Sequence, residues 1–152
     1  MTDDFAGFRP TLLEFLAELE RNNRRDWFAA NKRRYEQEVV MPSLAFISAM
    51  AAELERFAPC FRALPLRSGG SLMRIYRDTR FTRDKRPYKT NLGIQLRHEQ
   101  GGDVHAPAYY FHVDSREVFV GVGAWRPPAR RAGPPGWPTP GTMRVWQMQP
   151  GA

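Results

Sequence analysis

Hydrophobic residues in about the first sixty positions recur with the 3.6-residue period of an α-helix. A first helix is predicted to begin at Thr11, which opens a Thr-x-x-Glu capping box, and to stop at Asn22. Two more helices are predicted over residues 26–41 and 43–58, with Pro42 as the break between them. The apolar members of these segments are typical of helix faces that pack on a core.

Beyond Gly70 the period changes to two, which is typical of β-strands. Residues 91–97, 108–114 and 117–123 each alternate between apolar and polar positions. Residues 72–77 are predicted to form a fourth strand, with two possible orientations. The fold class predicted is α+β, with the N-terminal helices packed on one face of an antiparallel sheet of about four strands.

Turn lengths predict the register of the three central strands. A two-residue turn at Ser115–Arg116 places His112 opposite Phe119. A longer loop through Gly101–Gly102 places Gly93 opposite His112. Because directly opposed residues share a face, one face is predicted to be apolar and the other to be small and polar. The apolar face should include Ile94, Phe111 and Val120, and the polar face Gln95, Tyr110 and His112.

The length of 152 residues predicts one domain, which we place at residues 1–128. The composition changes at Pro127, because seven of the last 26 residues are proline and four are glycine. No helical or strand period continues there. Residues 129–152 are therefore predicted to form a disordered tail.

The positive charge is concentrated in one segment of the chain. The net charge is +7, and residues 62–98 hold ten Lys or Arg against two Asp, a balance of +8. Residues 1–61 hold eight against ten, a balance of −2, and residues 99–152 hold five against four, or +1. A local field of this sign attracts phosphates and other anions.

Several features of the sequence predict a cytoplasmic protein. The N-terminus is acidic where a signal peptide is basic, and no apolar run approaches the length of a membrane span. Cys60 is the only cysteine, so no internal disulfide forms. We expect Cys60 to be a buried apolar thiol rather than a nucleophile.

The segment from Arg74 to Lys89 is the main candidate for function. Arginine presents a planar fork of donors that matches phosphate or carboxylate oxygens. The carboxylates of Asp78 and Asp84 compensate two of the cations, so the rest face water or a ligand. The structural alternative is that Arg–Asp pairs, such as Arg77 with Asp78 or Asp84, only pin the loop to the body of the domain. The residues predicted to bind an anion are Arg74, Arg77, Arg80, Lys85, Tyr88 and Lys89. Phe81 and Tyr88 are expected to anchor the loop rather than to stack on bases.

Three residues are candidates for acid–base catalysis: His112, Asp78 and Asp84. Imidazole titrates near neutral pH, although a structural strand histidine is the alternative for His112. A metal site formed by His98, His105 and His112 is not expected. The predicted register separates His98 from His112 by roughly 16 Å, at about 3.3 Å per residue, whereas ligands lie about 2 Å from the metal. No motif for a cofactor or a Walker-type phosphate loop is present.

The loop sequence resembles a bacterial family catalogued as domain of unknown function 2461. Its characteristic positions are occupied by Arg74, Arg77, Asp78, Arg80, Phe81, Asp84, Lys85 and Tyr88. Similar flanking segments are residues 23–28, 109–112 and 121–125, so that the resemblance covers about residues 5–128. The family has no established activity. Its members typically continue after Trp125 into a helical segment, which implies a truncated or altered C-terminus here.

Three classes of function remain open at this point. The leading one is binding of a phosphorylated or otherwise anionic ligand, a small molecule or a nucleic acid, by the Arg74–Lys89 loop. The second is an enzyme that acts on a phosphorylated substrate, by hydrolysis or phosphoryl transfer. The third is a protein-interaction module that docks an acidic partner. The sequence does not indicate an oligomeric state.

Overall fold

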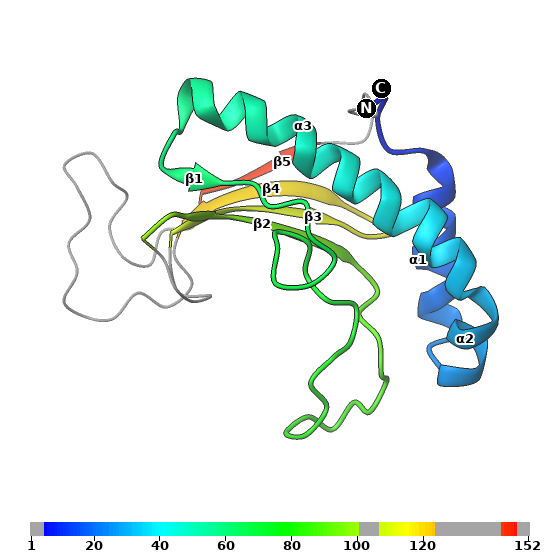
Figure 1. The fold of residues 1–152 in the computed structure, drawn as a ribbon. Coiled ribbons are helices and arrows are strands. Elements are labelled where there is room, and N and C mark those ends of the chain that lie inside the picture. Colours follow the sequence, from blue (N-terminus) through cyan, green and yellow to red (C-terminus); the bar gives the residue numbers. More distant parts are fainter. Residues whose placement is uncertain (1–4, 101–106, 124–143, 149–152) are drawn as a thin grey trace.

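A computed structural model describes residues 5–100, 107–123 and 144–148, and it confirms the α+β class (Figure 1). The elements are α1 (Pro10–Arg21), α2 (Arg25–Arg34), the π-helical η1 (Tyr35–Val40), α3 (Met41–Phe57), β1 (Phe61–Arg62), β2 (Leu92–His98), β3 (Ala108–Val113), β4 (Val118–Gly123) and β5 (Arg144–Met148). The helices lie on one side of the sheet. None of the described helices is long and apolar enough to cross a membrane.

Helix α1 ends where the sequence predicts but begins differently. Asn22 is its C-terminal cap, as expected, whereas the N-terminal cap is Arg9 and makes no side-chain hydrogen bond. Pro10 takes the first helical position, where its fixed φ angle suits the helix and its missing N–H has no partner to lose. Thr11 is therefore inside the helix, and the predicted capping box is wrong.

The predicted break at Pro42 is also wrong, because α2, η1 and α3 follow one another without an interruption. Pro42 cannot donate the backbone hydrogen bond of a regular α-helix. The wider π-helical turn directly before α3 accommodates it. The fully buried Ser43 adds a hydrogen bond from its Oγ to the carbonyl of Val39, at 2.5 Å.

The sheet is antiparallel, with five strands in the order β1-β2-β3-β4-β5. The predicted register of its centre is confirmed: His112 pairs with both Gly93 and Phe119. The turn between β3 and β4 is closed by a 3.0 Å hydrogen bond from the Asp114 N–H to the Glu117 carbonyl. The period of two and the turn length were thus sufficient to align these strands.

Residues 72–77 do not form the predicted fourth strand. Leu72 makes an isolated bridge to Ile94, beside the edge of β2 that β1 also uses, and the chain then leaves the sheet. The additional strands are the two-residue β1 and β5, which pairs with β4. Strand β5 lies inside residues 129–152, so this part of the predicted disordered tail has regular structure; the rest of the tail lies outside the described residues.

The two faces of the sheet differ as predicted. Ile94 is fully buried, and its partner Phe111 packs on Phe46 of α3 with ring centroids 5.0 Å apart. Gln95, Tyr110 and His112 lie on the opposite face, which the helices do not cover. This uncovered face is available for a site.

Cys60 is exposed, so the predicted buried thiol is wrong. It lies in the turn between α3 and β1, where the next residue, Phe61, takes the core position. A residue in a turn does not belong to the face of a helix or strand. The apolar character of the cysteine side chain was therefore not enough to predict whether it is buried.

Candidate functional site

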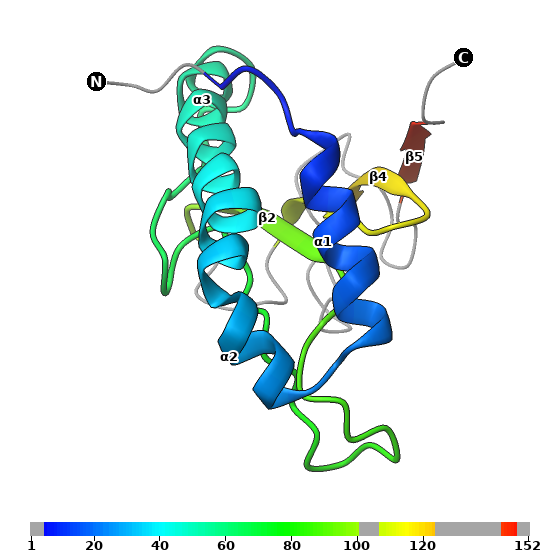
Figure 2. The same ribbon diagram turned by 90° about the vertical axis from the view of Figure 1, so that its right-hand side faces the viewer.

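The cationic loop is closed by a short backbone ladder at its base. The Arg77 N–H donates to the Pro87 carbonyl at 2.9 Å, and the Lys89 N–H donates to the Ile75 carbonyl at 2.7 Å. Tyr76 and Tyr88 form a bridge between these bonds. The loop extends away from the sheet at the end of the molecule where α2 lies (Figure 2). Its base, rather than its tip, is held in a defined position.

Tyr88 anchors this base to the helices, as predicted. Its ring is buried and stacks on Phe28 of α2, with centroids 4.2 Å apart. The side chain of Asn23, between α1 and α2, accepts a hydrogen bond from the Tyr88 N–H at 3.0 Å and donates one to the Tyr88 carbonyl at 2.9 Å. Tyr88 therefore supports the loop.

Asp84 holds two of the arginines of the loop. It accepts hydrogen bonds from Arg86 Nη2 at 2.8 Å and from Arg77 Nη1 at 2.7 Å, and its Oδ1 also accepts the Arg86 N–H. The Arg86 side chain, then its backbone N–H and Arg77, hold the pKa of Asp84 well below its usual value. Arg77 and Arg86 thus share one carboxylate, which engages both guanidinium groups but neutralises only one of their two charges.

Asp78 holds Arg80 in the same manner. Arg80 donates to Asp78 from Nε at 2.9 Å and from Nη2 at 2.6 Å, and these bonds lower the pKa of Asp78 to about 2. The pair is exposed. Phe81 is 91% exposed, so its predicted role as an anchor is wrong; the Arg80 guanidinium lies 5.5 Å from its ring centroid.

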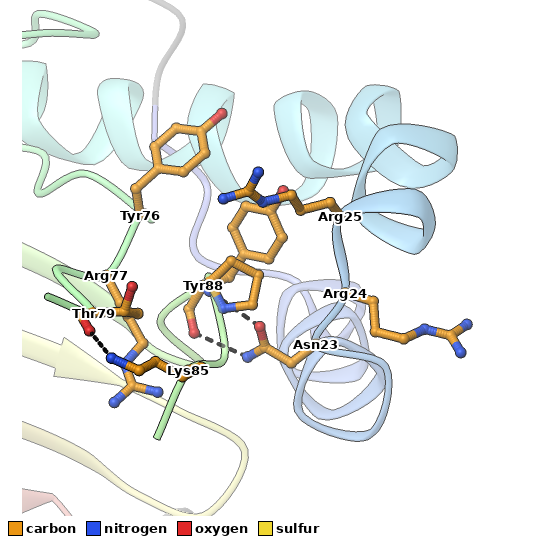
Figure 3. A pocket seen from close by; sticks show the side chains of 9 residues that line it. Asn23, Arg24, Arg25, Tyr76, Arg77, Thr79, Lys85 and Tyr88 are labelled. Atoms are coloured by element: carbon orange, nitrogen blue, oxygen red, sulfur yellow. Dashed lines mark hydrogen bonds between the residues drawn. The ribbon is translucent and has the colours of Figure 1, made fainter. Parts of the chain in front are cut away.

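An open hollow of about 590 Å³ lies between the loop and the start of α2 (Figure 3). It is lined by Asn23, Arg24, Arg25, Tyr76, Arg77, Thr79, Lys85, Pro87 and Tyr88. Lys85 Nζ donates to the Thr79 carbonyl at 2.7 Å, and Arg24 pairs with Asp26 and points away from the hollow. Most of the cations here are already engaged, and Asn23 and Tyr88 have structural roles.

A second hollow, of about 330 Å³, lies between the base of the loop and the polar face of the sheet. Its lining residues are Met73, Arg74, Arg77, Asp78, Lys89, Asn91, Gly93 and Tyr110. Within the described residues, no carboxylate pairs with Arg74 or Lys89. Lys89 is half-buried, and its burial, followed by the charge of Arg74, lowers its pKa.

Gly93 gives this second hollow its floor. A Cβ atom at this position would lie 3.0 Å from Met73 Sδ and 3.1 Å from Tyr110 Oη. Both contacts are tighter than ordinary van der Waals distances, so a larger residue would displace them. The absent side chain lets the Tyr110 hydroxyl lie close to the backbone of β2.

His112 connects Tyr110 to a carboxylate. Its Nε2 lies 3.1 Å from Asp114 Oδ2, and its Nδ1 lies 3.3 Å from both Tyr110 Oη and Asn91 Nδ2. The imidazole stacks on Phe119, with centroids 4.6 Å apart and planes 12° from parallel. The ring is therefore held in one orientation on the polar face.

Asp114 determines which nitrogen of neutral His112 carries the hydrogen. Its Oδ1 accepts the N–H groups of Arg116 and Glu117, at 2.7 and 2.8 Å. Burial raises the pKa of Asp114, but these bonds and His112 together outweigh it, so the net pKa is lowered. An ionised carboxylate only accepts, so Nε2 bears the hydrogen and Nδ1 presents its lone pair to Tyr110.

His98 and His112 lie far apart along the sheet, as the predicted register requires. The His98 N–H bonds to the Pro107 carbonyl at 3.0 Å, and Pro107 lies far along the strand from His112. His105 lies outside the described residues. His112, Asp114 and Glu117 offer ligand atoms within 4.8 Å of one another. Both oxygens of Asp114 already accept hydrogen bonds, and we place no ion there.

The structure divides the predicted site residues among several places. Arg74, Arg77, Asp78 and Lys89 line the smaller hollow; Arg77, Lys85 and Tyr88 line the larger one; and Arg80 and Asp84 line neither. Sequence reasoning missed three hydrogen-bond partners of His112: Asn91, Tyr110 and Asp114. Strand alternation had placed Tyr110 and His112 on one face, which is the signal that could have joined them.

The chain matches the family described as conserved hypothetical protein (DUF2461) over residues 11–132. Because this match covers most of the 152 residues, the protein belongs to that family, which confirms the resemblance found in the loop. No curated protein and no solved structure matches the chain.

Proposed function

We propose that the protein binds a phosphorylated or otherwise anionic small molecule in the smaller hollow, between the base of the loop and the polar face of the sheet. One observation carries this proposal: Arg74 and Lys89 line the same hollow, and no carboxylate of the described residues pairs with either. The charge of Arg74 helps to lower the pKa of Lys89, so the two adjacent cations carry an electrostatic cost in the empty protein, which the nearby charge of Asp78 offsets in part. A bound anion removes that cost and accepts their hydrogen bonds.

The neighbouring charges support this place over the larger hollow. Arg77 and Asp78 also line the smaller hollow, but Asp84 compensates Arg77 and Arg80 compensates Asp78. The charge available to a ligand therefore comes from Arg74 and Lys89. In the larger hollow, Arg24 points away, Arg77 is bound by Asp84 and Lys85 donates to the Thr79 carbonyl, while Arg25 has no carboxylate partner among the described residues. The smaller hollow differs because its two cations are close enough for Arg74 to lower the pKa of the half-buried Lys89.

Polar groups beside the two cations supply further hydrogen bonds. Asn91 and Tyr110 line the smaller hollow and are part-buried. Gly93 leaves room for the Tyr110 hydroxyl against the backbone of β2, and so positions that hydroxyl beside the hollow. Charged residues with a few polar groups in a small concave site suit a phosphate group better than an apolar ligand.

Thermal denaturation with inorganic phosphate tests the proposal. Phosphate should stabilise the parent protein by about 2.7 kcal/mol at one hundred times its dissociation constant. Lys89→Met should reduce the response to about 1.4 kcal/mol or less at the same phosphate concentration, because binding about tenfold weaker or more is expected. Arg83→Met removes the same charge from an exposed position that lines neither hollow, and it should keep the response.

Phosphate also stabilises proteins without binding to a site, so chloride at matched ionic strength and the Arg83→Met variant serve as controls. A parent that responds equally to both salts would refute the proposal. An equal phosphate response in Lys89→Met and Arg83→Met would do so as well.

A nucleic acid or an acidic protein is the second candidate ligand, and the exposed Phe81 beside Arg80 favours it. Aromatic side chains can stack on bases while cations contact phosphates. An affinity for single strands that falls steeply with salt would support this alternative, whereas a small-molecule site has a shallow salt dependence. A cytoplasmic location remains part of the proposal.

A further inference from the structure

Asp114, His112 and Tyr110 form a hydrogen-bonded series that ends in the smaller hollow. We propose that Tyr110 is a nucleophile, with His112 as its general base, and that it attacks a phosphate ester bound by Arg74 and Lys89. This inference rests on the proposed function, because it requires the anion to lie in the same hollow. It adds a reaction and a substrate class, a phosphate ester, to a binding site.

Among the described residues that line the smaller hollow, Tyr110 alone carries a hydroxyl group. The carboxylate of Asp78, which also lines it, already accepts two hydrogen bonds from the Arg80 side chain. Arg74 and Lys89 are cations suited to stabilising charge on phosphate oxygens. The phenol is therefore the group best placed to form a bond to phosphorus.

A base is needed because this phenol holds its proton strongly. Burial raises the pKa of Tyr110, and a hydrogen bond from Asn91 opposes the change only in part. The lone pair of His112 Nδ1, 3.3 Å from the hydroxyl, is the acceptor for that proton. Asn91 Nδ2 lies at the same distance from Nδ1, so two donors share one lone pair and both contacts are long.

The proposed step is a displacement at phosphorus. A bond forms between Tyr110 Oη and phosphorus, and the bond between phosphorus and the ester oxygen breaks. The phenol proton moves to His112 Nδ1 and is passed through solvent to the departing alkoxide, which lies on the opposite side of phosphorus and leaves as an alcohol. Water then attacks the phosphotyrosine, releases Tyr110 with its proton restored, and yields phosphate. No oxidant or further reactant is required.

Asp114 is a positioning residue in this scheme. It keeps the hydrogen on Nε2, and so leaves Nδ1 free to act as the base. In Asp114→Asn, the amide can donate to Nε2 while its oxygen still accepts the turn N–H groups of Arg116 and Glu117. The hydrogen would then move to Nδ1, and the base would be lost while the turn remains.

Labelling with an aryl sulfonyl fluoride tests the nucleophile without knowledge of the substrate. The reagent transfers its sulfonyl group to a tyrosine oxygen and releases fluoride, and mass spectrometry measures the rate at each tyrosine. Tyr76 is 57% exposed and serves as an internal reference. Tyr110, although less exposed, should be labelled at least about tenfold faster than Tyr76, because a general base contributes about that much or more.

Two variants identify the base. His112→Phe keeps a ring to stack on Phe119, and it should reduce the Tyr110 rate at least about tenfold while the Tyr76 rate stays the same. Asp114→Asn should have a similar effect, and ¹⁵N NMR should show the hydrogen of His112 moving from Nε2 to Nδ1. If Asp114 only stabilised the turn, the substitution would leave the hydrogen on Nε2.

The outcomes separate this inference from the proposed function. Fast labelling of Tyr110 that depends on His112 and is blocked by phosphate supports both. If Tyr110 is labelled no faster than Tyr76 while phosphate still stabilises the parent, Tyr110 is not the nucleophile and the binding site stands. If Tyr110 is labelled rapidly but phosphate neither protects it nor stabilises the protein, the proposed anion site fails, and with it the attack on a phosphate ester.

Discussion

The side chain of Asn23 forms two hydrogen bonds with the backbone of Tyr88, 65 residues away in the sequence. This contact brings together two segments that resemble the family and lie far apart along the chain. Asn23 precedes α2, Phe28 of α2 stacks on Tyr88, and Tyr88 closes the base of the cationic loop. The helices thus hold Lys89, the residue after Tyr88, beside the polar face of the sheet.

Replacing Asn23 with alanine should destabilise the protein by about 1–3 kcal/mol, because a backbone N–H and a carbonyl lose their partner. Urea denaturation measures this loss, and faster hydrogen exchange at the Tyr88 amide would place it at the loop. Asn31→Ala is the matched control, since Asn31 bonds to Trp27 within its own helix. It should cost less than about 0.5 kcal/mol. Equal losses in the two variants would contradict the anchoring role.

The arginines of the loop should respond unequally to mutation. Arg80→Ala should leave the melting temperature unchanged within error, because its pair with Asp78 is exposed. It should weaken the phosphate response, because it leaves the carboxylate of Asp78 unpaired beside the smaller hollow. Asp84→Asn should lower the melting temperature, because it leaves both Arg77 and Arg86 without their carboxylate. A large loss in Arg80→Ala, together with no phosphate response in the parent, would mean that the arginines only pin the loop.

The effect of Asp84→Asn should depend on pH in one direction. The folded state lowers the pKa of Asp84, so the ionised carboxylate adds stability above its unfolded value of 3.8. That stability is lost as the pH falls through the folded pKa. The difference in melting temperature between parent and variant should therefore shrink from about pH 5 to about pH 2. A constant difference over this range would exclude the ionised pair as its cause.

Lys89→Met should make the empty protein more stable at neutral pH. The folded state lowers the pKa of Lys89 below its usual 10.5, so its charge costs stability while the ammonium is protonated. Between the folded pKa and 10.5, the unfolded chain binds more protons, and the stability of the parent rises with pH. The stability difference between Lys89→Met and the parent should therefore shrink as the pH rises over that range. Arg83→Met, the control, should show no such trend in thermal melts.

The regular part of the fold was predictable because its signals are local. The period of two and a two-residue turn were enough to pair His112 with Phe119. The path of the chain at Pro42 was not predictable, because a π-helical turn absorbed the missing N–H. Residues 72–77 alternate as a strand does, but only the bridge at Leu72 and the hydrogen bond from the Met73 N–H to Gly93 join them to the sheet, because the chain then turns into the loop.

The candidate site was predictable in composition but not in its pairings. The charge pattern located the cations between Arg74 and Lys89, but whether each one has a carboxylate depends on the path of an irregular loop. Asp84 takes two arginines and Asp78 takes one, which leaves Arg74, Arg83, Lys85 and Lys89 without a carboxylate, and of these Arg74 and Lys89 line the smaller hollow. The position of Phe81 was not predictable for the same reason. An aromatic side chain in an irregular loop can either pack on the domain and anchor the loop or extend into solvent.

A double-mutant cycle on phosphate affinity tests the central claim most directly. Isothermal titration at fixed ionic strength compares the parent with Arg74→Gln, Lys89→Gln and the variant carrying both. If both side chains contact one anion, each single change should weaken binding by about tenfold or more. The double change should differ from the sum of the single changes by at least about 0.5 kcal/mol. Equal affinity in all four proteins, or no phosphate binding by the parent, would contradict the account.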